Sequence, residues 1–357
     1  MRVAFAGGNG YPPEDFGGVQ SSTHDMALRL QARGGVPAVL APLYGDGAFG
    51  LAARARLKLG RAKTVEDDRA GYPVHRAWHP DQAVGAFCDA FRPDVAVVQC
   101  HGTVPIAKGF VAADVPVVIY LRNVEFSELG GNPGALEVQH FIANSRFTAE
   151  AYRAAFGLGA TVIPPTVEPA RFQTETSGEF VTFIGPVAEK GLAKALEIAR
   201  RCPDIPFLFC ESWALDPAAL DALSAAIRPM PNIKFERRCA DIRGVFSRTR
   251  ILLAPSMWDE AWGRVASEAH CSGIPVLGSN RGGLPEAIGP GGATLDYDAP
   301  TDDWVRSLRR IWDDPDEHRR LSAAALSYSR RPEMNGDRQF ETLLAILADA
   351  ARGRIAA

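Results

Sequence analysis

The sequence lacks the features that mark several classes of protein. Its six cysteines are scattered through 357 residues, with no CxxC pair and no histidine at zinc-ligand spacing, so neither a disulfide framework nor a structural zinc site is expected. No apolar run reaches 18 residues, and the N-terminal segment MRVAFAGGNG is too short and too rich in glycine for a signal peptide. These absences favour a soluble cytoplasmic protein. The net charge of −3 offers no overall field for binding nucleic acid, and without a GxGxxG fingerprint a nicotinamide-dependent dehydrogenase is disfavoured.

What the sequence does contain is a regular alternation of short apolar runs with helical stretches. The runs are apolar throughout, as expected of parallel strands covered by helices on both faces. In the first half they are Val3–Ala6, Ala38–Leu40, Val95–Val98, Val117–Leu121, Phe141–Ala143 and Thr161–Ile163. In the second half they are Phe180–Ile184, Phe207–Cys210, Ile233–Phe235, Ile251–Ala254 and Pro275–Leu277.

A proline-bearing polar segment, residues 164–178, separates the two arrays and is predicted to be a linker. The pattern predicts an α/β protein with two Rossmann-like parallel-sheet domains facing across a cleft, residues 1–166 and 167–335. Residues 336–357 are expected to form a C-terminal helix that crosses back to the first domain.

A basic run occupies residues 54–63, with Arg54, Arg56, Lys58, Arg61 and Lys63 and no acidic residue among them. At helical spacing these charges would spread around the axis, which argues against a helix lying in a membrane surface. We therefore predict a solvated mobile loop; a loop that docks an acceptor or a membrane is the weaker alternative.

The segment 254–289, APSMWDEAWGRVASEAHCSGIPVLGSNRGGLPEAIG, predicts two successive strand–loop–helix units. The first helix is expected to end at Gly273, and the second to begin at Gly282-Gly283 with Pro285 as its first residue. Both helices would start at the carboxyl ends of strands and direct free backbone N–H groups into one anion site. Glu260 is expected in the loop before the first helix, and Glu268 two turns inside it.

This segment resembles glycosyltransferase family 4, a retaining family with the GT-B fold. The family pattern E-x7-E, G-x-P-V and G-G-x-x-E is present here as Glu260–Glu268, Gly273–Val276 and Gly282–Glu286. The resemblance extends to the glycine loop GGVQSSTHDMALRLQARG (17–34), the strand RPDVAVVQCHG (92–102), the strand and helix at 141–157, and the phosphate-loop position IGPVAEKG (184–191).

The resemblance implies a role for each matching residue. Glu260 would contact the reacting sugar, Glu268 the ribose, and Lys190 the diphosphate, whereas His101 would contact substrate at the end of its strand. The remaining residues expected to bind the nucleotide or the donor are Gly17, Gly18, Trp262, Gly263, Gly282, Gly283 and Glu286. No cofactor and no metal is implied, and the D-x-D sequence at 296–298 is interpreted as a variable polar loop.

The sequence departs from the family pattern at the phosphate loop and after one strand. Pro186 stands where the family carries an arginine, and Arg264 is the candidate replacement cation, so both Lys190 and Arg264 are predicted to be catalytic. Where many relatives have a histidine after the strand 117–121, this chain has Arg122-Asn123.

The predicted function is transfer of a sugar from a UDP- or GDP-linked donor to an unidentified hydroxyl acceptor, by front-face displacement. Two alternatives remain open at this stage. One is a sugar-nucleotide epimerase of the same architecture, and the other is a non-catalytic relative that binds a sugar nucleotide, with the missing arginine as a symptom of lost activity.

Overall fold

The computed structural model describes residues 1–45, 47–60, 62–239 and 241–353, which divide into two compact units. Unit 1 comprises Met1–Thr166 together with the segment that starts at Gly336, and unit 2 comprises Val167–Asn335. Each unit is a parallel α/β sheet with helices on both faces. Within the described ranges, no helix has the length and apolar character needed to cross a membrane.

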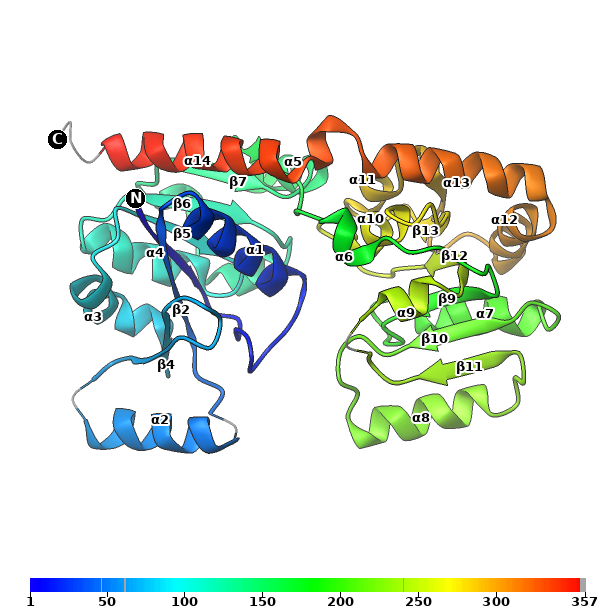
Figure 1. Cartoon of the computed structure of the whole chain (residues 1–357), viewed down its shortest axis with the longest axis horizontal. Helices are drawn as coiled ribbons and strands as arrows, with labels where there is room; N and C mark the ends of the chain where they lie inside the picture. Colours follow the sequence, from blue (N-terminus) through cyan, green and yellow to red (C-terminus); the bar gives the residue numbers. More distant parts are fainter. Residues whose placement is uncertain (46, 61, 240, 354–357) are drawn as a thin grey trace. The chain divides into compact units, whose positions relative to one another are not determined.

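Unit 1 contains an eight-stranded sheet in the order β3-β4-β2-β1-β5-β6-β7-β8 (Figure 1). Its pairs are parallel except for β3 with β4 at one edge. The strands are β1 (Arg2–Gly7), β2 (Val36–Pro42), β3 (Val65–Asp67), β4 (Val74–Ala77), β5 (Val95–Gln99), β6 (Val117–Leu121), β7 (His140–Ala143) and β8 (Thr161–Val162).

Two layers of helices cover this sheet. The helices are α1 (Gly18–Ala32), α2 (Gly47–Leu59), α3 (Pro80–Phe91), α4 (Thr103–Ala112), α5 (Arg146–Phe156) and α14 (Gly336–Gly353). Side chains of α3, α4 and α5 pack on one face, and those of α1 and α14 pack on the other. From α14, Phe340, Leu343 and Leu347 enter the core beside Met26 of α1, so the last helix completes the apolar cover of the first unit.

Unit 2 contains a fully parallel sheet of six strands in the order β11-β10-β9-β12-β13-β14. The strands are β9 (Phe180–Ile184), β10 (Phe207–Cys210), β11 (Ile233–Glu236), β12 (Thr249–Ala254), β13 (Val276–Ser279) and β14 (Gly292–Leu295). The helices are α6 (Pro169–Phe172), α7 (Leu192–Arg201), α8 (Pro217–Ile227), α9 (Arg243–Phe246), α10 (Arg264–His270), α11 (Leu284–Ile288), α12 (Thr301–Asp313) and α13 (Pro315–Ser329).

Each sheet has one point where the chain stops adding strands on one side and starts adding them on the other. In unit 1 this point lies between β1 and β5, and in unit 2 it lies between β9 and β12. The loops after the two neighbouring strands diverge there and leave a crevice at the carboxyl ends, where α/β proteins bind ligands. The strand order thus selects one candidate site in each unit.

The strands predicted from apolar runs are present, with ends shifted by at most two residues. The sequence did not reveal β3, β4 and β14, because these strands are short and carry polar or small residues. The fully buried Arg76 in β4 is an example: its guanidinium is paired with Asp67 at 2.6 Å and Glu14 at 3.2 Å.

Three local predictions were wrong. Most of the basic run forms part of α2 instead of a loop, while Arg61 lies outside the described residues. The segment 164–178 is not wholly irregular, since it contains α6 with the buried Phe172. Pro285 is the second residue of α11 and not its first. Docking of α2 to an acceptor or membrane stays an untested prediction.

Candidate functional site

Lys190 lies in the loop that follows β9, at the switch point of unit 2. The loop turns through Gly185 at φ +79° and Gly191 at φ +84°, both in the left-handed region that favours glycine. A Cβ on Gly191 would overlap the carbonyl oxygen of Pro255, which follows β12. The main-chain oxygen of Glu189 also accepts a hydrogen bond from Met257 N at 2.9 Å. The loops after β9 and β12 are thereby tied together by their backbones.

Glu260, from the loop after β12, forms an ion pair with Lys190. The distance from Lys190 Nζ to Glu260 Oε1 is 2.5 Å, and Ser256 Oγ donates to the same oxygen at 3.0 Å. The side chains of Lys190 and Glu260 are 22% and 15% exposed, so the pair is largely shielded but can still be reached by a ligand. The structure brings together two residues that lie 70 positions apart in the sequence.

The glycine pair 282–283 holds the backbone of Glu260. Gly283 N donates to Glu260 O at 2.6 Å, and a Cβ on Gly282, whose φ is +62°, would overlap that oxygen. The Gly283 N–H was predicted to face a bound anion, but it is occupied by this contact. The double glycine therefore positions Glu260 through contacts with its backbone. Contact of the two glycines with the donor stays a prediction.

Glu268 forms an ion pair with Arg264 one turn earlier on α10, with Arg264 Nε 2.7 Å from Glu268 Oε1. Both side chains are about 15% exposed, at 14% and 16%. Because α10 begins at Arg264, after Gly263 at φ +90°, Glu268 lies little more than one turn inside the helix, and the prediction of two turns was wrong. The helix ends at His270, followed by a turn through Gly273. The helices α10 and α11 are only seven and five residues long, so their dipoles are weaker than expected.

Trp262 was expected to bind the nucleotide or the donor, but the structure places it in the core of unit 2. Its side chain is 4% exposed and packs in the core beneath the loop, with Nε1 donating to Ser267 Oγ at 3.0 Å. Instead, Trp258 and Trp213 flank the Lys190 ammonium, whose nitrogen lies 5.0 Å and 5.3 Å from their ring centres. Such cation–π contacts restrict the position of the ammonium group.

The remaining polar residues of this region give no sign of a metal centre. Among the described residues, no cluster of three or more histidine, cysteine or acidic side chains could hold an ion. Asp298 of the D-x-D sequence pairs with Arg281 at 2.9 Å, and Asp296 Oδ1 accepts from the Asp298 backbone. Glu286 lies in the first turn of α11, where its carbonyl oxygen accepts a hydrogen bond from Tyr328 Oη at 3.0 Å.

In unit 1, the loop after β1 meets the end of β5 at His101. Gly8 N donates to His101 O at 2.8 Å, and Asn9 Oδ1 accepts from His101 N at 3.2 Å. His101 is exposed, whereas Cys100 before it is buried with φ +62°. Burial raises the pKa of the Cys100 thiol to about 12, so it stays protonated and is a poor nucleophile.

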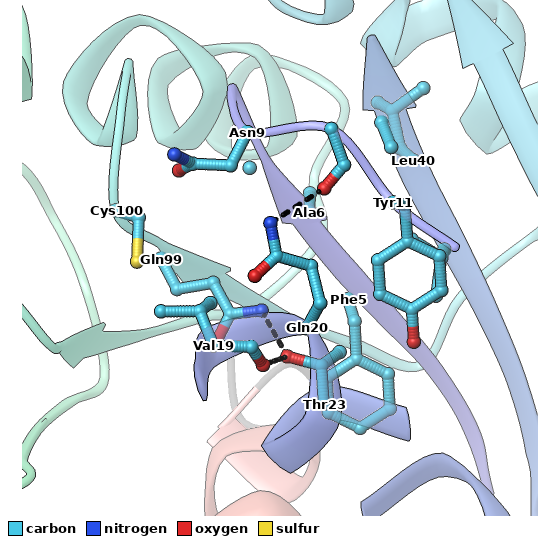
Figure 2. A pocket seen from close by; sticks show the side chains of 14 residues that line it. Phe5, Ala6, Asn9, Tyr11, Val19, Gln20, Thr23, Leu40, Gln99 and Cys100 are labelled. Carbon is cyan, nitrogen blue, oxygen red and sulfur yellow. Dashed lines mark hydrogen bonds between the residues drawn. The ribbon is translucent and has the colours of Figure 1, made fainter. Parts of the chain in front are cut away.

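A small hollow lies at this switch point, and Figure 2 shows the amide side chains that line it. Gln99 Nε2 donates to Thr23 Oγ1 at 2.7 Å, and Gln20 Nε2 donates to Gly10 O at 3.1 Å. The Gln99 Oε1 atom is buried and has no hydrogen-bond partner. Gly17 caps the N-terminus of α1 and Gly18 is its first residue, next to Val19 and Gln20, which line the hollow.

Sequence reasoning missed the amides at Gln20 and Gln99 and the tryptophans at 213 and 258. Gln99 lies at the end of an apolar strand, where its position before His101 was a usable signal. Trp213 follows β10 and has no motif around it, so its place beside Lys190 depends on the strand order alone.

Two family descriptions match most of the chain. "Glycosyl transferases group 1" matches residues 168–327, and "Glycosyltransferase Family 4" matches residues 16–171. The chain is 30% identical over 141 residues to the D-inositol 3-phosphate glycosyltransferase of Streptomyces bingchenggensis, covering 38% of this chain and 30% of that protein. The protein of the same name from Segniliparus rotundus is 25% identical over 289 residues, with 73% and 63% covered. For the first three such relatives the match spans only 24% to 30% of their length.

Solved structures share the fold at low sequence identity. A glycosyltransferase from Rickettsia africae has a TM-score of 0.76 at 13% identity, with 98% of each chain covered. HepE of Anabaena, in complex with UDP-glucose, has a TM-score of 0.76 at 17% identity, with 97% of this chain and 99% of that chain covered. The two parallel-sheet units therefore have the GT-B fold, and the chain belongs to the group 1 glycosyltransferases of family 4.

Proposed function

We propose that this chain is a metal-independent glycosyltransferase that moves a hexose from a nucleoside diphosphate sugar to a hydroxyl acceptor, with retention of configuration. The observation that carries the proposal is the Lys190–Glu260 ion pair at the switch point of unit 2. A cation for the leaving diphosphate and a carboxylate for the sugar stand next to each other, on loops held by glycines that leave no space for a side chain.

Lys190 stabilises the departing diphosphate. Its ammonium group is held between two indole rings and Glu260, so it is positioned before the donor binds. When the diphosphate leaves, negative charge grows on its oxygens, and a preorganised cation stabilises that charge more than it stabilises the bound donor. Arg264 is paired with Glu268, which is proposed to bind the ribose. We therefore assign Arg264 to nucleotide binding and not to stabilisation of the leaving group.

Glu260 orients the sugar and offsets the positive charge that develops at the anomeric carbon. Ser256 and Lys190 both donate to Oε1, which leaves Oε2 for hydroxyl groups of the sugar. The bond between the anomeric carbon and the diphosphate oxygen breaks, and the bond to the acceptor oxygen forms on the same face. The acceptor proton passes to the leaving diphosphate, so no protein nucleophile is needed.

Glu268 and Glu286 are assigned to nucleotide binding. Gly263 and Gly282 have no side chain and would let the nucleotide approach the backbone closely. Glu268 Oε1 is taken by Arg264, and the remaining oxygen accepts hydrogen bonds from the ribose hydroxyls. The complexes of HepE with UDP and UDP-glucose support a uridine donor.

The acceptor is assigned to unit 1. His101 and the amide groups of Gln20 and Gln99 beside the hollow offer hydrogen-bonding groups suited to hydroxyl groups. Several relatives carry the name D-inositol 3-phosphate glycosyltransferase, so a phosphorylated cyclitol is the first acceptor to test.

The decisive experiment measures release of nucleoside diphosphate from UDP-sugars with and without an acceptor. We expect release that depends on the acceptor in the wild type. We expect Glu260→Gln to reduce turnover by more than ~10-fold while calorimetric UDP affinity changes little, because the charge acts mainly in the transition state. The matched control is Asp259→Asn, at an exposed neighbouring carboxylate. Wild-type turnover in Glu260→Gln would contradict the mechanism, and interconversion of UDP-sugars without release of UDP would indicate an epimerase.

A further inference from the structure

Arg122 is a buried cation without a carboxylate partner. The residue is 7% exposed and directly follows β6 in unit 1. Among the described residues, none places a carboxylate oxygen within 4.0 Å of its guanidinium group. In the described part of the chain, Nε is buried without a hydrogen-bond partner, and Nη2 donates a hydrogen bond to Met26 Sδ at 3.9 Å. A buried charge normally has a charged partner, because desolvation of an unpaired ion is costly.

The surroundings hold the guanidinium group in place without neutralising it. Its central carbon lies 3.9 Å from the ring centre of Tyr120, and the Tyr120 hydroxyl donates to Ile163 O at 2.6 Å. Stacking on the tyrosine fixes the plane of the guanidinium group and leaves its edge, which carries the N–H donors, for another ligand. This geometry is suited to an oxyanion, which can accept two parallel hydrogen bonds from one arginine.

Beside Arg122 is a small hollow that is partly open to solvent. Its lining contains a single cation, the neutral polar residues Ser22, Thr166 and Gln339, and apolar side chains, but no aspartate or glutamate. Hydroxyl and amide groups beside one arginine are typical partners of phosphate oxygens. The lining therefore places one arginine among neutral groups and contains no carboxylate.

The hollow also lies where the chain passes between the two units. Thr166 is the last residue of unit 1 before unit 2, and Gln339 lies in the first turn of α14, just after the chain returns. Helices α1 and α14 cover the same face of the sheet, and both contribute lining residues. An anion bound here would contact α14 and the last residue of unit 1 before Val167.

We propose that Arg122, with Ser22, Thr166 and Gln339, forms an oxyanion-binding site in unit 1 that accepts a phosphate group. Its residues belong to unit 1, whereas Lys190, Glu260 and Glu268 of the proposed donor site belong to unit 2. The phosphate is either a free anion or the phosphate group of an acceptor. Because the site is defined by binding, it stands or falls independently of the proposed transfer activity.

The test is the thermal stability of the full chain at constant ionic strength, with inorganic phosphate as the probe. All proteins carry Lys190→Met, because phosphate is also expected to bind at the donor loop. We expect phosphate to raise the Tm of this parent by at least ~3 °C near saturation. Adding Arg122→Met should abolish the rise and leave the Tm without phosphate equal or higher, because an uncompensated charge is removed.

A second variant keeps the test decisive if Arg122→Met folds poorly. Arg122→Lys retains the charge but loses the forked donors, and calorimetry should show phosphate affinity reduced by ~10-fold. A parent that shows no rise, or an Arg122→Met protein that keeps the full rise, would overturn the proposal.

The two sources of the phosphate are separated by titrating inositol 3-phosphate and inositol against the same proteins. Binding of inositol 3-phosphate at least ~10-fold tighter than inorganic phosphate, lost in Arg122→Met, identifies the phosphate group of an acceptor. Equal affinity for the two phosphates, also lost in Arg122→Met, identifies a free anion. Equal binding of inositol alone would show that the phosphate is not recognised and would contradict the proposed site.

Discussion

The switch points of the two units share one geometry but differ in chemistry. In both, a glycine loop after a central strand touches the loop of the neighbouring strand through a backbone carbonyl oxygen: Gly8 reaches His101 in unit 1, and Gly191 reaches Pro255 in unit 2. In unit 2 the crevice holds the Lys190–Glu260 ion pair, whereas in unit 1 it is lined by amide groups and a neutral hollow. The same strand order can therefore build a charged site or a neutral site, depending on the side chains that follow the strands.

The comparison predicts its largest effect at Lys190. We expect Lys190→Met to reduce turnover by ~100-fold or more, since it removes one preorganised electrostatic contact with the leaving group. The matched control is Lys194→Met in the first turn of α7. The Lys194 ammonium donates to Ala299 O and makes no contact with Glu260. Steady-state kinetics of both variants decide the point, and equal effects of the two would show that Lys190 has no special role.

A smaller effect is expected at Glu268. Replacement by alanine should weaken UDP binding by ~1.5–3 kcal/mol, because the ribose contact is made in the ground state and the transition state alike. The variant also leaves Arg264 unpaired, so Glu268→Ala is compared with Glu268→Ala/Arg264→Met by calorimetry. Unchanged UDP affinity in both would remove Glu268 from the nucleotide site.

In unit 1 the expected effect is on the acceptor alone. Gln99→Leu removes the amide beside the hollow, and the KM for the acceptor should rise by ~3–10-fold with little change in kcat. Because Gln99 Oε1 already lacks a partner, we expect the free energy of unfolding to change by less than ~1 kcal/mol. A fall in kcat with the acceptor KM unchanged would place Gln99 near the reacting bond. The crevice of unit 1 would then act on the reaction itself and not only on acceptor binding.

The smallest effect is expected from metal removal. Turnover after treatment with EDTA should stay within ~2-fold of the untreated enzyme, because lysine and backbone N–H groups stabilise the diphosphate. Loss of turnover that magnesium or manganese restores would show that the charged crevice is incomplete without an ion.

The sequence was sufficient for the fold because buried parallel strands are apolar along their whole length. Val117–Leu121 and Phe180–Ile184 were predicted with the ends that the structure has. The edge strands β3 and β14 could not be predicted in this way, because β3 carries Glu66 and Asp67 and β14 begins with small residues, so neither is an apolar run. The helical state of α2 was missed because its apolar Phe49 and Leu57 pack on a small local core that the charge pattern does not reveal.

The site was predictable where a contact depends on a motif and unpredictable where it depends on strand order. Glu260 and the double glycine are close in sequence, and the structure adds the reason for the glycines, which is contact with the Glu260 backbone. Lys190 follows β9, and its partners come from the loops after β10 and β12, so no local pattern could assemble Trp213, Trp258 and Glu260 around it. Trp262 was misassigned because a tryptophan beside a site motif has equal reason to pack into the core.

The return of α14 to unit 1 has a consequence for synthesis on the ribosome. The core of unit 1 lacks Phe340, Leu343 and Leu347 until the last helix has been made, whereas unit 2 is complete once residue 335 has emerged. Until then, the sheet face that α14 covers is exposed to water over β5 and β6. The unit that is translated first is therefore the unit that finishes folding last. Chains truncated before α14 would expose an apolar surface on unit 1 that favours aggregation, although unit 2 would be complete.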